Sequence, residues 1–227
     1  MLSESFGVLQ AALLGVVGLI LAFGLSLSLS RYEDRRDAIV TETNAIGTSY
    51  LRAQTLPEPL RTRSLDLLAE YTASAREISE YPPDSAEEKV VSAREDVLQN
   101  RLWALAAAAL DAEPVASAPR LYAQSLNEAI DAQVSRTAAL HNQVPTAVLV
   151  LELVGASFAL GLLAAYLALV GRGLAGVLLA ALLVVLLLFV TADLDRPTRG
   201  PIEIPDTPLA ELHEQMQGPP AVPAPPR

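Results

Sequence analysis

The sequence contains no cysteine, one tryptophan, two histidines and a single lysine among its 16 basic residues. The absence of cysteine excludes disulfides, zinc–thiolate sites and thiol catalysis. Neither His141 nor His213 has a serine and a carboxylate placed near it in the way of a catalytic triad, and no glycine-rich phosphate loop follows a strand pattern. We therefore expect no enzyme activity, no metal site and no cofactor.

Positive charge is also scarce. The chain has 26 acidic residues against 16 basic ones, a formal net charge of −10. Between residues 31 and 143 there are 12 basic and 18 acidic residues. Binding to nucleic-acid phosphates needs clustered Lys and Arg, so we expect no nucleic-acid partner.

The chain is rich in long apolar runs. Val144–Val170 and Leu174–Ala192 are each long enough to cross a bilayer core, which takes about 20 apolar residues. Only Gly171-Arg172-Gly173 separates them, so the two runs predict a helical hairpin. A third run, Ser5–Ser30, carries no charge after Glu4. It exceeds the ~7–15 apolar residues of a secretory signal and lacks a basic start, so we expect it to stay as an anchor rather than be cleaved after Ser26-Leu-Ser28.

The orientation of the three spans follows from the charges beside them, because loops rich in Lys and Arg stay in the cytoplasm. Six arginines flank the spans on one side, and a seventh, Arg172, lies on the other. We expect a multi-pass protein of the cell inner (plasma) membrane, with residues 31–143 and the tail in the cytoplasm. The six arginines are Arg31, Arg35, Arg36, Arg136, Arg196 and Arg199.

Four helical segments are predicted around the region between spans 1 and 2. Span 1 has no helix breaker before Pro57, so a helix from Val8 to Leu56 is expected to project beyond the membrane. Ser85-Ala-Glu-Glu88 is a capping box that starts a helix running to Ala112, with Val90, Val97 and Leu98 on its buried side. The other two segments are Glu58–Glu80 and the stretch from Ser117 towards Pro145.

These patterns predict an all-α integral membrane protein. Three transmembrane helices carry a cytoplasmic four-helix-bundle-like module, built on extensions of spans 1 and 2. The tail has nine prolines in the 31 residues after Arg196, so we expect it to be mostly disordered, with room for one short helix at Pro208–Gln217. The expected domains are span 1 with a short outer N-terminus (1–30), the cytoplasmic helical module (31–143), the transmembrane hairpin (144–195) and the Pro-rich cytoplasmic tail (196–227).

Glu152 is the sharpest candidate for function. It lies about two turns inside span 2, where a charge costs at least ~2.5 kcal/mol, and intramembrane carboxylates often mark ion or proton paths. If the spans run in register, Glu152 is level with Phe23–Ser26 of span 1. It is either part of such a path, or a neutral carboxyl that bonds a serine or reaches towards the interface.

Other polar and small residues near the spans allow two interpretations each. Ser26, Ser28 and Ser30 could line an aqueous path or bond back to helix carbonyls. Asp193 and Asp195 could attract cations at an inner mouth, or pair with Arg31, Arg35 or Arg36. Small residues at four-residue spacing in span 2 allow close helix contact, either within the three-helix unit or between subunits. These small residues are Ser157, Gly161 and Ala165.

Several short motifs together resemble the bestrophin-like family of bacterial membrane proteins, a domain family of unknown function. They are Arg31-Tyr-Glu-Asp-Arg-Arg36, Glu42-Thr-Asn-Ala-Ile-Gly-Thr-Ser-Tyr-Leu-Arg52, Leu56-Pro-Glu-Pro59, Gln124-Ser-Leu-Asn-Glu-Ala-Ile-Asp131, and Asp193-Leu-Asp-Arg-Pro197 with Gly200. The resemblance covers roughly residues 8–210. It implies a shared helical architecture.

The family has a fainter similarity to bestrophin anion channels. There a membrane-helix Phe precedes an Arg-aromatic-aromatic-Glu segment; here Phe23 precedes Arg31-Tyr32-Glu33, which is one aromatic shorter. The Arg and Asn that follow that Phe in bestrophins are absent from Gly24–Ser30, and bestrophins have an additional membrane segment. The resemblance implies Phe23 as a pore constriction.

Two functions therefore compete at this point. The first is a homo-oligomeric ion channel or ion-conducting pore, because a three-helix protomer cannot readily enclose an aqueous path alone. The second is a membrane-anchored helical interaction or sensory module without transport activity. The partners expected are the lipid bilayer, further copies of the chain and an inorganic ion.

Overall fold

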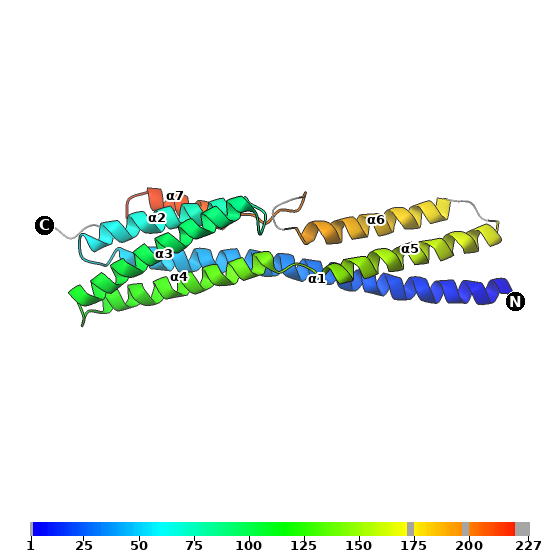
Figure 1. The fold of residues 1–227 in the computed structure, drawn as a ribbon, viewed down its shortest axis with the longest axis horizontal. Coiled ribbons are helices and arrows are strands. Elements are labelled where there is room, and N and C mark those ends of the chain that lie inside the picture. Colours follow the sequence, from blue (N-terminus) through cyan, green and yellow to red (C-terminus); the bar gives the residue numbers. More distant parts are fainter. Residues whose placement is uncertain (1, 172–174, 197–199, 221–227) are drawn as a thin grey trace. The chain divides into compact units, whose positions relative to one another are not determined.

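The computed structural model describes residues 2–171, 175–196 and 200–220, and over these residues the chain is helical without any strand (Figure 1). The all-helical expectation is thereby confirmed. Arg172 and Arg199, which were used to orient the spans, lie outside the described residues, as do the last seven residues of the tail. The helices are α1 (Leu2–Ala53), α2 (Leu60–Ile78), α3 (Ala86–Ala112), α4 (Ser117–His141), α5 (Thr146–Leu169), α6 (Ala175–Leu194) and α7 (Thr207–Gln217).

The chain divides into two compact units. The first, here called the membrane unit, comprises Met1–Glu33 and Asn142–Glu203. The second, called the core unit, comprises Asp34–His141 and Ile204–Arg227. Helix α1 contributes to both, because it runs without interruption from Leu2 to Ala53.

The membrane unit holds the apolar parts of α1, α5 and α6. Among the described residues, three helical stretches are long and apolar enough to cross a bilayer. Tyr166 of α5 lies against Gly7 of α1, and Glu152 lies against Gly24. Position numbers fall along α5 as they rise along α1, so the two helices run antiparallel. Helix α6 packs on α5 and completes the hairpin.

The helix expected from Ser117 towards Pro145 is present but ends before that proline. Helix α4 ends at His141 and α5 begins at Thr146, with the residues between them outside any helix. Pro145 causes the break, because it has no N–H to donate and disfavours helical backbone at the residue before it. The Val144 N–H that the break releases donates instead to Asp195 Oδ1 at 2.8 Å.

The core unit buries one apolar cluster between its helices. Ile39 and Ile46 of α1, Leu68 of α2, Leu102 of α3 and Leu126 of α4 belong to it. At the start of α3, the Ser85 side chain accepts from the Glu88 N–H at 3.1 Å, as the capping box predicts. One prediction is wrong: Val90 and Val97 of α3 are exposed, and Glu95 is buried instead.

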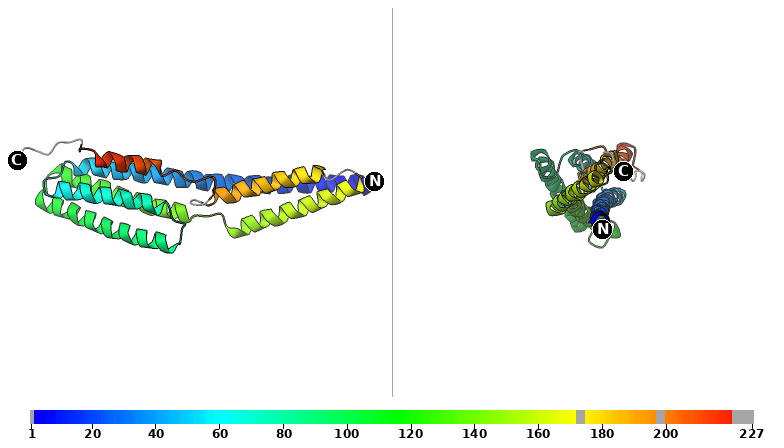
Figure 2. Two further views of the ribbon diagram at one scale, coloured as in Figure 1. Left: turned by 90° about the horizontal axis from the view of Figure 1, so that it is seen from above. Right: turned by 90° about the vertical axis from the view of Figure 1, so that its right-hand side faces the viewer.

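The short helix that the sequence allows in the tail is present: residues 207–217 form α7, which packs against α2 (Figures 1 and 2, in red). Leu209, Leu212 and Met216 recur on one face of α7 and are buried there. Burial of this apolar face stabilises α7, although the tail around it is rich in proline. Gly47 of α1 marks the crossing, since a Cβ placed on it would lie 3.5 Å from Leu212 Cδ1.

Candidate functional site

The membrane unit places a carboxylic acid in its interior. Glu152 is 1% exposed, and neither of its carboxyl oxygens has a hydrogen-bond partner among the described residues. Gly24 lies directly against the carboxyl, and a Cβ at that position would overlap it. Only glycine therefore leaves room for the acid between α1 and α5.

Phe23, Ser26 and Ser30 lie on a face of α1 that the membrane unit leaves uncovered. Phe23 is 65% exposed, and both serines are exposed as well. At about 100° per residue the three positions fall within roughly 60° of one another around the helix. Ser28, one of the three alternating serines, is instead fully buried.

Asp193 and Asp195 both accept backbone hydrogen bonds within the membrane unit. Asp193 Oδ2 takes the Ile202 N–H at 3.0 Å, and Asp195 Oδ1 takes the Val144 N–H described above. Gly200 has φ +127° and lies directly against the Asp193 carboxylate, so a side chain there would be strained and would collide with it. The two acids therefore hold the segments that follow α6 and precede α5.

Arg31 and Arg35 differ in their surroundings. Arg31 is half-buried. Arg35 is fully buried in the core unit, where its Nε donates to the Ala139 carbonyl at 3.2 Å. This contact ties α1 to the last turn of α4.

Ser157, Gly161 and Ala165 face outwards from the membrane unit. All three are exposed, and a Cβ placed on Gly161 would meet nothing within 4 Å. Ser157 Oγ donates to the Leu153 carbonyl of its own helix. The small residues that α5 buries are instead Ala156 and Ala159.

A cluster of buried charged side chains lies in the core unit, outside the apolar stretches, and sequence reasoning missed it. Arg136 of α4 is fully buried; its Nε lies 2.6 Å from Glu42 Oε2 of α1, and its Nη2 lies 3.3 Å from Glu95 Oε1 of α3. Its Nη1 donates to the Ala75 carbonyl of α2 at 2.7 Å. One guanidinium thus joins four helices.

Amide and phenol groups complete this cluster. Gln133 Nε2 donates to Glu95 Oε2 at 3.1 Å, and the Tyr71 hydroxyl donates to Glu42 Oε1 at 3.4 Å. Gln99 Nε2 in turn donates to the Tyr71 oxygen at 3.3 Å. We call Glu42, Tyr71, Glu95, Gln133 and Arg136 the buried charge cluster.

The buried charge cluster has one cation for two carboxyls, and burial disfavours their charged forms. Desolvation raises the pKa of Glu42 to about 7, against the lowering effect of Arg136. Desolvation also raises the pKa of Glu95, although Arg136 and Gln133 oppose it. The pKa of Tyr71 lies well above its usual value, first because of burial and then because of the two carboxylates. The cluster can hold one proton near neutral pH.

Only two residues of this cluster carry a signal in the sequence, and the signal is weak. Arg136 stands out only as a basic residue near span 2, and Glu95 as an acid among the apolar residues of α3. Within the described residues no group of three or more His, Cys, Asp or Glu side chains could hold a metal ion. The chemistry available here is ionic pairing and proton binding.

The fold and these sites define a polytopic α-helical membrane protein with a charged interior in its second unit. A family model, the Bestrophin-like domain, matches residues 3–209. The chain therefore belongs to the Bestrophin-like family.

Solved structures share the fold. A crystal structure of a bacterial Bestrophin homolog from Klebsiella pneumoniae aligns with a TM-score of 0.73 at 15% identity, over 94% of this chain and 85% of that chain. A single-residue variant of that homolog aligns with a TM-score of 0.74 at 15% identity, over 92% and 87%. A structure described as a membrane protein variant gives 0.75 at 14% identity, over 94% and 85%. No curated protein matches the sequence.

Proposed function

We propose that the chain assembles into a symmetric homo-oligomer of the inner membrane that conducts a small inorganic ion. The observation that carries this proposal is the uncovered face of α1, where Phe23, Ser26 and Ser30 lie together and exposed. Two hydroxyls and one ring on a single face suit the wall and constriction of an aqueous path better than a lipid contact. Family membership and the fold support the same function.

The small residues of α5 provide a surface for assembly. Ser157, Gly161 and Ala165 are exposed in the single chain, and small residues at this spacing let helix backbones approach closely in a bilayer. In the proposed oligomer they contact a neighbouring subunit. A ring of subunits would then turn the α1 faces towards a common axis.

The charged residues near the spans would act on the ion path from behind its wall or at its inner end. Glu152 lies behind the uncovered face of α1, so its charge would act on the ion path through the helix that Gly24 lets approach it. Asp193, Asp195 and Arg31 would lie at the inner mouth, whereas the fully buried Arg35 would join α1 to α4. The excess of arginines beside residues 31–143 favours a cytoplasmic core unit, built as a helical bundle on the extension of α1.

Planar-bilayer recording of the purified full chain tests the proposal. We expect unitary currents, and we expect Phe23→Ala to change their amplitude at least about twofold, because removing a ring widens a constriction. Phe189→Ala is the matched control, because Phe189 is an exposed ring on α6 rather than on α1. Silence under varied anions, cations and pH would overturn the proposal.

The oligomeric state gives a second, independent test. Native mass spectrometry in mild detergent is expected to show one discrete ring of subunits, and Gly161→Leu is expected to weaken it. A monomer would instead support the competing function, a membrane-anchored interaction or sensory module.

A further inference from the structure

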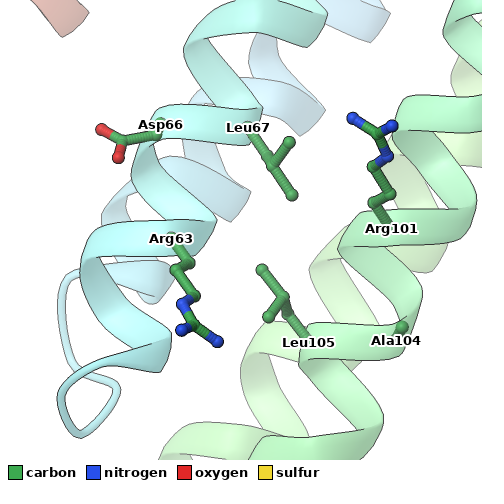
Figure 3. Close-up of a pocket in the computed structure, with 6 residues that line it drawn as sticks. All are labelled: Arg63, Asp66, Leu67, Arg101, Ala104 and Leu105. Carbon is green, nitrogen blue, oxygen red and sulfur yellow. The ribbon is translucent and has the colours of Figure 1, made fainter.

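A groove lies between α2 and α3 on the surface of the core unit (Figure 3). It is a shallow groove, open to the surface, with a volume of about 420 Å³. Leu67 of α2 and Leu105 of α3 face each other across its floor (Figure 3). Its lining residues are Arg63, Asp66, Leu67, Arg101, Ala104 and Leu105.

Two arginines flank the apolar floor. Arg63 reaches in from α2 beside Leu105, and Arg101 reaches in from α3 beside Leu67 (Figure 3). Both are exposed, and among the described residues neither guanidinium forms a hydrogen bond or an ion pair. The acid in the lining does not neutralise them, because the Asp66 carboxylate points to the opposite side of α2 (Figure 3).

These unpaired guanidiniums contrast with most other arginines of the same unit, although Arg36 is also unpaired among the described residues. Arg76 pairs with Asp206, and Arg94 pairs with Glu77. Arg52 donates to the Leu121 carbonyl, and Arg120 donates to the Pro114 carbonyl. The chain has 26 acidic residues, yet neither of the two guanidiniums beside the apolar floor is paired with one.

We propose that this groove binds a free medium-chain fatty acid, with the carboxylate on a guanidinium and the hydrocarbon body on Leu67, Ala104 and Leu105. Guanidinium groups offer paired N–H donors that match a carboxylate. The apolar floor favours burial of a hydrocarbon chain. An inorganic anion would leave the floor wet, and a neutral lipid would leave both cations unpaired.

Photo-crosslinking of the full chain in lipid nanodiscs tests the assignment. The probe is decanoate carrying a diazirine on its chain, and labelled peptides are mapped by mass spectrometry. We expect labelling in Leu60–Ile78 and Ala86–Ala112, competed by unlabelled decanoate and not by decanol. Labelling confined to the membrane helices, or equal competition by decanol, would overturn the proposal.

Substitutions separate the groove from nonspecific partition into lipid. Arg63→Gln with Arg101→Gln is expected to weaken competition at the groove roughly tenfold, because a charge-assisted pair is lost. Arg36→Gln is the control, since Arg36 is also exposed and unpaired among the described residues but lines no part of the groove. Unchanged labelling in the double variant would contradict the proposal, whether or not the protein conducts ions.

Discussion

The Arg136 guanidinium lies 2.6 Å from the Glu42 carboxylate, and neither side chain is exposed to water. The contact joins α4 to α1, while the same guanidinium reaches Glu95 of α3 and a carbonyl of α2. Its geometry is that of an ionic contact, since neither Arg136 Nε nor Glu42 Oε2 has a hydrogen-bond partner among the described residues. The core unit therefore depends on charge as well as on apolar packing.

Arg136→Met is expected to destabilise the core unit by about 3–5 kcal/mol, because it leaves two buried carboxyls without their cation. Thermal unfolding followed by circular dichroism in detergent measures the loss. The control is Arg120→Met, an exposed arginine of the same helix, which we expect to shift stability by less than about 0.5 kcal/mol. If the two variants unfold alike, the cluster has no stabilising role.

Stability is expected to fall as the pH rises from about 4.5 towards 7 and then to level off. Glu42 has a pKa of about 7 in the folded protein and near 4.5 when unfolded, so in this interval only the folded state holds the proton. Raising the pH through this interval therefore lowers the free energy of unfolding by on the order of 3 kcal/mol in total. The raised pKa of Glu95 acts in the same direction.

Glu42→Gln isolates this contribution. The variant removes the titrating group and keeps the shape, so its unfolding midpoint is expected to change less between pH 5 and pH 8 than that of the unsubstituted protein. Glu128→Gln, an exposed acid on α4, is expected to keep the full pH slope. A slope that survives in Glu42→Gln would mean that the proton binds elsewhere.

Gly24→Ala is expected to destabilise the membrane unit by about 1–3 kcal/mol, because its methyl group would overlap the Glu152 carboxyl. Gly15→Ala is the matched control, since a Cβ there meets nothing within 4 Å and the added methyl favours the helix. Adding Glu152→Ala to Gly24→Ala should recover part of the loss. Equal midpoints for the two glycine variants would contradict the close approach.

Leu209→Ala is expected to release α7 from the core unit. Leu209 is fully buried, and truncation of a buried leucine typically costs about 2–5 kcal/mol. Limited proteolysis should then cut the tail near residues 204–217 several times faster. Val115→Ala, at a side chain that is almost wholly exposed, is expected to leave the cleavage rate unchanged.

The helices could be predicted because their signals are local. Apolar runs mark the spans, Ser85 starts α3, and the capping contact of Ser85 with Glu88 is present as the pattern requires. The short helix allowed at Pro208–Gln217 also forms. Each of these depends on neighbours within a few residues.

The buried faces were harder to predict, because they depend on which charges meet from distant segments. Apolarity alone favours Val90 and Val97 as the buried side of α3, yet the structure buries Glu95. Arg136 lies 41 residues from Glu95, and nothing near either residue indicates the other. Burial of a glutamate without such a partner is energetically costly, so the apolar pattern predicts that Glu95 is exposed.

The closeness of Glu152 and Gly24 was partly predictable. The lengths of the spans predict that Glu152 lies level with Phe23–Ser26, and in the structure its carboxyl lies against Gly24. The sequence did not indicate that a glycine would make the room, since Gly15 and Gly18 in the same helix contact nothing at their Cβ positions. Only the packing of α5 distinguishes them.

The buried charge cluster draws its members from α1, α2, α3 and α4, and no pair of these helices contains it all. In a partly assembled chain Arg136 and the two glutamates would stay hydrated. They would then lose little solvation energy and gain little from pairing with one another. The favourable contacts appear together when the fourth helix docks, and each strengthens the others. Assembly of the core unit should therefore be all-or-none, with no stable three-helix intermediate.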